Sequence, residues 1–289
     1  MLFRSYAAAN NCTSFATIGD VVYHEYGHGI NDKYYQSVGG SFNNGAMGEG
    51  YADTWAMGVT ENPVLGLGMS SVDSTEYIRV YNQTPKVYPN DITGEVHNDG
   101  EIICGAWWDL GENLGNHQQM MDLFAETFNA AITGPDGTEG QVYVDILIEA
   151  LTDDDVPANG GDNDITNGTP NDLDIVNAFD RHGITLLSNA TLDHTPVEAN
   201  NGSTVIDISA TVTLQYPWAL QNALMYYKIN NDASWTTLPL TNTGGTTYSA
   251  QIPAQPLGTL IAYYLALQNM NGVLDRKSTR LNSSHIPLS

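Results

Sequence analysis

The spacing of apolar residues changes once along this chain of 289 residues, near residue 195. Up to about residue 187, apolar positions recur every three or four residues, as they do in helices that bury one face. From about residue 195, short runs alternate between apolar and polar residues, and turn-forming Asn, Gly and Pro separate them. We therefore expect a mainly helical domain over residues 6–187 and an antiparallel β-sandwich over residues 195–274.

Six segments carry the helical spacing. The first five span residues 19–30, 45–59, 100–114, 117–132 and 142–151. In the sixth, NDLDIVNAFDRHG, the preceding Thr169 and Pro170 predict an N-cap and a first helical position. Asp172 would complete a capping box, and Gly183 would end the helix.

The alternating runs predict the strands of the second domain. They are TVIDISATVTLQY, ALMYYKI, TYSAQI and LIAYYLAL, and we expect turns in the NND, TNTGG and PAQPLG segments between them.

Acidic residues dominate the charge of the chain. It has 33 Asp and Glu against 9 Lys and Arg, for a formal net charge of −24. Nucleic acid is excluded as a partner, because phosphate binding needs clustered basic residues. No apolar run approaches the roughly 20 residues of a membrane span. A composition that is acidic, poor in Lys and rich in Asn, Thr and Gly suggests a secreted protein.

Both ends of the chain resemble translated sequencing-adapter sequence. The segments are MLFRS at residues 1–5 and DRKSTRLNSSH at residues 275–285. We expect residues 1–5 and 275–289 to be artefacts, which leaves five basic residues in a native segment of residues 6–274. Residues 1–20 contain no apolar core of a signal peptide, as expected either for a missing N-terminus or for a cytoplasmic protein. Cys12 and Cys104 either form a disulfide or remain as two thiols.

The stretch VVYHEYGHGIN at residues 21–31 predicts a metal site. His24 and His28 are four residues apart, so a helix brings both imidazoles to one face, where they can share an ion. Glu25 lies one step around the helix, where a carboxylate can take a proton from a metal-bound water. A metzincin is excluded, because Asn31 and Tyr34 stand where that class has a glycine and a third histidine.

A catalytic zinc needs a third protein ligand, and a second helical segment, NNGAMGEGYADTW, carries two acids. Its Glu49 and Asp53 are four residues apart on one face. Together, HEYGHG and GEGYAD resemble the motifs of the thermolysin and fungalysin group of gluzincin peptidases. This resemblance implies that His24, His28 and Glu49 bind zinc. It also implies that the carboxylate of Asp53 holds the imidazole of one of these ligands, His24.

Later motifs extend the resemblance. The stretch GEVHNDGEIICGAWWDL resembles the V-H-x-x-G-x-I segment of this group, which implies that His97 donates a hydrogen bond to the oxyanion. Arg79 precedes His97 as the Arg that binds the substrate carbonyl does in thermolysin-like enzymes, and a surface salt bridge is the competing interpretation. Neither Tyr34 nor Tyr35 aligns without a gap with the Tyr that assists the oxyanion. Three further histidines lack metal-ligand spacing and are interpreted as structural: His117, His182 and His194.

The loop GGDNDITNGTP offers oxygen ligands of the kind that calcium prefers. They come from Asp162 and Asp164, with Asn163 and Asn167 nearby. An EF-hand is excluded, because its terminal bidentate Glu is absent. A calcium site and an acidic, solvated loop both stay open.

We therefore predict a monomeric, secreted zinc endopeptidase that acts on protein or peptide substrates, with Glu25 as the general base and His97 as the oxyanion donor. The β-sandwich resembles the immunoglobulin or fibronectin-type modules that follow secreted bacterial proteases. The HExxH motif lies too near the start of the chain to leave room for the β-rich N-terminal subdomain of thermolysin-like enzymes. In those enzymes, an edge strand of this subdomain pairs with the substrate, so zinc binding without cleavage stays open. Two alternatives also remain: a non-catalytic adhesion protein derived from a zincin, and a gluzincin exopeptidase, which would need an acidic pair to anchor the substrate amine.

Overall fold

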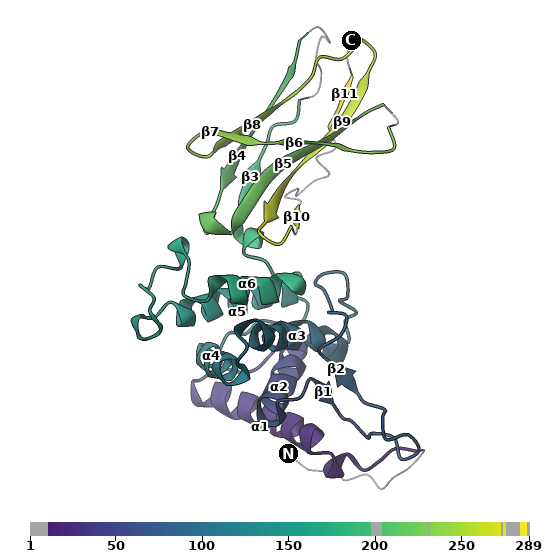
Figure 1. Cartoon of the computed structure of the whole chain (residues 1–289), viewed down its shortest axis with the longest axis vertical. Coiled ribbons are helices and arrows are strands. Elements are labelled where there is room, and N and C mark those ends of the chain that lie inside the picture. Colours follow the sequence, from purple (N-terminus) through teal and green to yellow (C-terminus); the bar gives the residue numbers. More distant parts are fainter. Residues whose placement is uncertain (1–10, 198–203, 231, 273, 276–283, 288–289) are drawn as a thin grey trace. The chain divides into compact units, whose positions relative to one another are not determined.

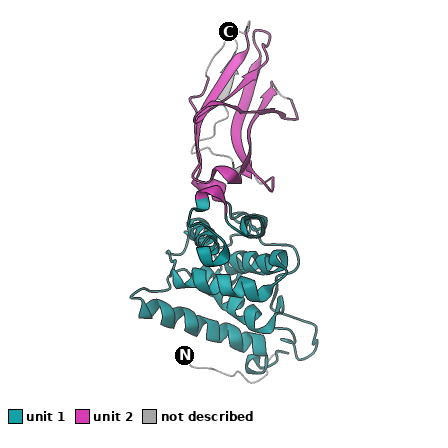
Figure 2. Ribbon diagram, turned by 60° about the vertical axis from the view of Figure 1, so that its left-hand side comes forward, with its two compact units in different colours: residues 1–165, 169–185 teal, residues 166–168, 186–289 magenta. Residues whose placement is uncertain are grey.

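The computed structural model describes residues 11–197, 204–230, 232–272, 274–275 and 284–287, and the chain forms two compact units (Figures 1 and 2). Unit 1 comprises residues 1–165 and 169–185, in teal in Figure 2, and unit 2 comprises residues 166–168 and 186–289, in magenta. A helical N-terminal region is followed by antiparallel β-sheets, as the sequence predicts.

The described part of unit 1 contains six α-helices. They are α1 (Gly19–Ser37), α2 (Gly45–Thr60), α3 (Val96–Leu114), α4 (His117–Asn129), α5 (Glu139–Asp154) and α6 (Asp172–Arg181). Between α2 and α3, β1 (Val64–Leu65) and β2 (Arg79–Val80) form an antiparallel ribbon. Unit 1 also contains the 3-10 helices η1 (Phe15–Thr17) and η2 (Pro157–Asn159), and η3 (Ile165–Asn167) begins in unit 1 and continues into unit 2. Each segment with predicted helical spacing coincides largely with one of these α-helices.

Helix α3 is the centre of the unit 1 core. It contacts α2, α4 and α6, and it is buried on nearly all sides from Asp99 to Gly111. The ring of Trp107 packs against Phe124 of α4 at 5.2 Å and against Phe179 of α6 at 5.4 Å between centroids. A helix with apolar contacts all round is a core helix, and it holds its neighbours at defined positions.

Polar side chains cap the N-terminal ends of α2 and α3. At the start of α2, Asn44 accepts a hydrogen bond from the backbone N–H of Met47 at 2.8 Å. At the start of α3, Glu95 accepts one from the backbone N–H of Asn98 at 2.9 Å. Such caps satisfy N–H groups that have no partner within the helix.

Helix α6 begins later than the sequence predicts, at Asp172 rather than at Pro170. The hydroxyl of Thr169 donates to the buried carboxylate of Asp154 at 2.6 Å, and the backbone N–H of Asn171 donates to it at 2.7 Å. The predicted N-cap at Thr169 is therefore wrong, because its hydroxyl is bound to the end of α5. The predicted stop is confirmed, since Gly183 follows the helix with a φ of 72°.

Unit 2 contains two antiparallel sheets (Figure 1). One has the order β3-β4-β8-β7 and consists of β3 (Thr191–Asp193), β4 (Ile206–Thr213), β8 (Thr247–Ile252) and β7 (Thr241–Gly244). The other has the order β10-β9-β5-β6 and consists of β10 (Leu274–Asp275), β9 (Leu260–Asn269), β5 (Leu220–Ile229) and β6 (Thr236–Pro239). Strand β11 (Ser284–Pro287) also pairs with β9. The 3-10 helices η4 (Leu186–Asn189) and η5 (Pro217–Ala219) precede β3 and β5.

Both sheets of unit 2 contribute to one buried apolar cluster. Ile208 of β4, Met225 of β5 and Tyr263 of β9 are among its members. Strict alternation of buried and exposed residues along β4 matches its sequence pattern. Strand β7 lies in the TNTGG segment that we predicted to be a turn. All its residues are exposed, so it has no apolar side that a pattern could reveal.

Parts of the predicted adapter segments lie outside the described residues, namely residues 1–5, 276–283 and 288–289. No disulfide joins Cys12, which is exposed, to Cys104, which is buried. Among the described residues, no helix combines the length and the apolar composition that crossing a membrane requires.

Candidate metal centre

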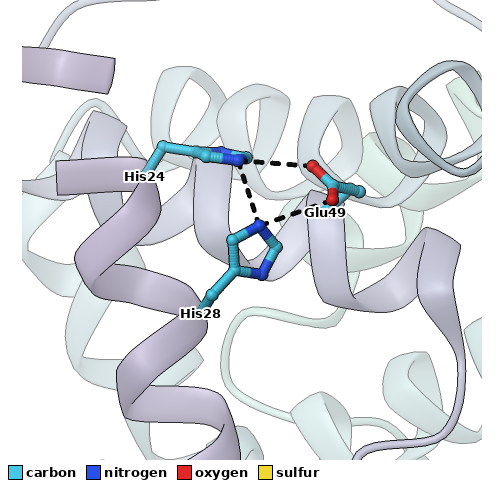
Figure 3. A group of neighbouring side chains, drawn as sticks. All are labelled: His24, His28 and Glu49. Carbon is cyan, nitrogen blue, oxygen red and sulfur yellow. Dashed lines mark hydrogen bonds and ion pairs between the residues drawn. The ribbon is translucent and has the colours of Figure 1, made fainter. Parts of the chain in front are cut away.

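Two imidazoles from α1 and one carboxylate from α2 converge in unit 1 (Figure 3). The Nε2 atoms of His24 and His28 are 3.1 Å apart. The carboxylate of Glu49 places Oε2 3.3 Å from His24 Nε2 and Oε1 3.4 Å from His28 Nε2. Among the residues that the structure describes, this is the only group of three metal-binding side chains with ligand atoms within 4.8 Å of one another.

The spacing of these atoms fits a small, tetrahedrally bound cation. Zinc bonds of about 2.0–2.1 Å place neighbouring tetrahedral ligands about 3.3–3.4 Å apart, and two imidazoles with a carboxylate are a ligand set of catalytic zinc. Oε2 of Glu49 is also buried, and although Nε2 of His24 and Nε2 of His97 lie 3.3 and 3.4 Å away, neither makes a hydrogen bond with it. A buried carboxylate oxygen without a donor is costly unless a cation compensates it. His24, His28 and Glu49 therefore suit zinc.

The electrostatics of the group also favour a cation. Burial by itself lowers the pKa of His24, but the carboxylates of Asp53 and Glu49 raise it to about 9. Burial by itself raises the pKa of Glu49, but the imidazoles of His24 and His28 hold it well below its usual value. The carboxylates thus stay ionised while an imidazole keeps a proton, and a metal ion would take the place of that proton.

Asp53 fixes the orientation of the His24 ring. Nδ1 of His24 donates to Oδ1 of the buried Asp53 at 2.5 Å, which leaves Nε2 to face His28 and Glu49. Zinc-binding histidines commonly donate their second N–H to a carboxylate in this way. The structure therefore brings Asp53 to the His24 ring, and its role behind a metal ligand stays a prediction.

Arg79 has a partner that the sequence prediction did not assign to it. Its Nε donates to Oδ2 of Asp53 at 2.7 Å, and its Nη2 donates to Oδ1 at 2.9 Å. The hydroxyl of Tyr81 donates to the same carboxylate. The proposed contact of Arg79 with a substrate carbonyl stays a prediction. Tyr81 was missed, although side chains two residues apart in an extended segment share a face, which could have paired it with Arg79.

His97 of α3 reaches the edge of the group. Its Nε2 lies 3.4 Å from Oε2 of Glu49, and its Nδ1 donates to Oε1 of Glu95 at 2.6 Å. The ring is half exposed, so a substrate could reach it. The sequence prediction missed Glu95, which both caps α3 and orients His97; its position two residues before the histidine was the available signal.

Glycines allow α1, α2 and α3 to approach closely enough for these side chains to meet. A Cβ on Gly27 would lie 2.9 Å from the Cα of Ala52 in α2. A Cβ on Gly100 of α3 would lie 2.8 Å from the backbone N of Gly50 in α2. Backbone atoms cannot move aside as a flexible side chain can, so larger residues would separate the helices.

Other candidate residues stand apart from this group. Tyr34 and Tyr35 donate their hydroxyls to the carbonyls of Asn129 and Ile132, so they make structural contacts near the end of α4. The loop with Asp162 and Asp164 gathers no comparable set of three ligands among the described residues, and calcium binding there stays a prediction.

The three histidines that we interpreted as structural contact protein groups. His182 contacts Lys86 O and Asp109, His117 contacts Glu112, and His194 contacts Ser209 O and Tyr263. Glu25 is half-buried on α1, and its role as a base stays a prediction.

No model of a known protein family matches this chain, and a search of curated proteins finds no match either. The geometry of the described residues is therefore the basis for assigning a function.

Proposed function

We propose that unit 1 is the zinc-binding catalytic region of a gluzincin-type endopeptidase. The convergence of His24, His28 and Glu49 with spacings suited to a tetrahedral ion is the observation that carries this proposal. Support also comes from two contacts: Asp53 accepts a hydrogen bond from His24, and Nε2 of His97 lies 3.4 Å from Oε2 of Glu49.

Each residue has a distinct task in the proposed reaction. Zinc, when bound, polarises the scissile carbonyl and makes the attacking water more acidic. Glu25 takes a proton from that water and later returns it to the leaving amine. His97, held by Glu95, donates a hydrogen bond to the oxyanion, and a donor of this kind typically contributes ~3–4 kcal/mol.

We propose a separate role for unit 2 as an immunoglobulin- or fibronectin-like β-sandwich that attaches or spaces the catalytic unit. Two antiparallel sheets that share one buried cluster support this comparison of architecture. Fold-level similarity alone assigns no ligand to it. The acidic composition is compatible with a secreted protein, and secretion is part of the proposal.

Metal stoichiometry tests the proposal first. The full chain, purified without added metal and analysed by plasma mass spectrometry, should contain about one zinc per molecule. Glu49→Ala should lose the zinc, since it removes one of three protein ligands. A folded wild-type protein that contains no zinc, even after zinc is supplied and excess removed, would contradict the proposal.

Substitution of the base tests the reaction. Glu25→Gln should keep the zinc and reduce casein hydrolysis by at least ~100-fold, the lower end of what a general base contributes. Parent activity in this variant would refute the assigned mechanism. If the wild-type chain binds zinc but leaves casein intact, the zinc site stands, and the proposal that this chain is an endopeptidase on its own is rejected.

A further inference from the structure

Tyr81 lies directly after β2 and is buried, with Met57, Cys104 and Trp108 in the same small cluster. Its ring therefore has an ordinary packing role. The hydroxyl, however, donates to Oδ2 of Asp53 rather than to a backbone carbonyl. A buried phenol that donates to an ionised carboxylate makes a stronger hydrogen bond than one to a neutral acceptor.

The carboxylate of Asp53 receives four donors. Oδ1 accepts from His24 Nδ1 at 2.5 Å and from Arg79 Nη2 at 2.9 Å. Oδ2 accepts from Arg79 Nε at 2.7 Å and from the hydroxyl of Tyr81. Two carboxylate oxygens offer about four acceptor positions, so all of them are filled. Asp53 cannot turn without breaking at least one charge-assisted hydrogen bond.

The two histidines differ in how exposed they are and in how many contacts hold their rings. His24 has a side chain only 8% exposed and is held from behind by Asp53. His28 is 28% exposed, and its described polar contacts are only His24 and Glu49. The orientation of His24 is therefore set before a metal arrives, while His28 can adjust.

We propose that Tyr81 is a positioning residue for zinc: with Arg79, it locks the Asp53 carboxylate that aims Nε2 of His24 at the metal. This inference rests on the proposed zinc site and extends it to a residue that touches neither metal nor substrate. Loss of the hydroxyl would loosen Asp53 and, through it, His24. Zinc affinity would fall although every metal ligand is intact.

Tyr81→Phe tests the inference, because it removes only the hydroxyl and keeps the buried ring. Tyr35→Phe is the matched control. Tyr35 is buried on α1, the helix of His24, but its hydroxyl donates to the carbonyl of Ile132 at 2.6 Å. The dissociation constant for Zn²⁺ would be measured for both variants by competition with a fluorescent chelator, and Co²⁺ absorption would report the coordination geometry.

We expect the Zn²⁺ dissociation constant of Tyr81→Phe to rise roughly tenfold or more, as for other losses of contacts behind metal ligands. Tyr35→Phe should match the wild type, even if both variants lose similar thermal stability. An unchanged constant in Tyr81→Phe, or an equal rise in both variants, would overturn the inference. A wild-type chain that binds no Zn²⁺ would instead reject the proposed zinc site itself.

A double-mutant cycle separates positioning from general packing. In an Asp53→Ala background, Tyr81→Phe should have no further effect on zinc affinity, because the carboxylate through which it acts is gone. A penalty of the same size in both backgrounds would show that Tyr81 acts independently of Asp53, and the inference would fail.

Discussion

The carboxylate of Asp153, near the C-terminal end of α5, lies where a negative charge is unfavourable. Its buried Oδ2 has no hydrogen-bond partner, and a negative charge at this end of a helix opposes the helix dipole. Burial and the nearby carboxylates of Glu149 and Glu126 raise its pKa from 3.8 to about 6, although the hydroxyl of Thr127 acts in the opposite direction. Because the pKa is higher in the folded state, the charge destabilises the fold increasingly as the pH rises from about 4 through 6.

Asp153→Asn should therefore stabilise unit 1 at pH 7.5 by up to about 1 kcal/mol, a value reduced for the partial exposure of the side chain. At pH 3.5 the wild-type carboxyl is largely protonated, and the advantage should almost vanish. Urea unfolding at the two pH values provides the measurement. A stabilisation of equal size at both would show that the charge is not its cause.

The close packing of α1 against α2 depends on one glycine inside the HEYGH stretch, Gly27. Gly27→Ala would place a methyl group against the backbone of Ala52, so the helices must separate and both histidines must move relative to Glu49. We expect zinc affinity to fall at least about tenfold, as when groups that orient a ligand are lost. Chelator competition would measure the change.

Gly29, two residues along the same helix, supplies the control, because a Cβ there would meet no atom within 4 Å. Gly29→Ala should leave zinc affinity unchanged and stabilise the helix by up to about 1 kcal/mol, from the better helix propensity of alanine. Equal zinc affinities in the two variants would disprove the role assigned to the close contact at Gly27.

At the scale of the whole molecule, each unit has its own buried apolar residues, and the candidate metal group lies in unit 1 alone. A metal that binds only the folded state stabilises the part that holds it, by ~2.7 kcal/mol when free zinc is 100 times its dissociation constant. Calorimetry should therefore show two transitions, and a chelator should lower only one. Glu49→Ala should abolish the response. A chelator effect of equal size on both transitions would contradict independent stabilisation.

Local patterns in the sequence determined the helices and most strands, and they brought out the candidate metal group. Helical spacing located α1 to α6, two-residue alternation located β4, β5, β8 and β9, and HEYGH with GEGYAD identified His24, His28 and Glu49. The helices and strands could be predicted because side-chain direction repeats with a fixed period in a helix or strand. The same period places two imidazoles four residues apart on one face.

The residues that surround the candidate metal group depend on contacts between distant segments. The contacts of Tyr81 and Arg79 with Asp53 join β2 and the residue after it to α2, and the loss of the Thr169 cap depends on a carboxylate at the end of α5. Strand β7 also could not be predicted from local spacing, because an exposed edge strand carries no apolar pattern. The sequence by itself determines what repeats within an element, whereas contacts between distant segments depend on how the whole chain packs, which no local spacing encodes.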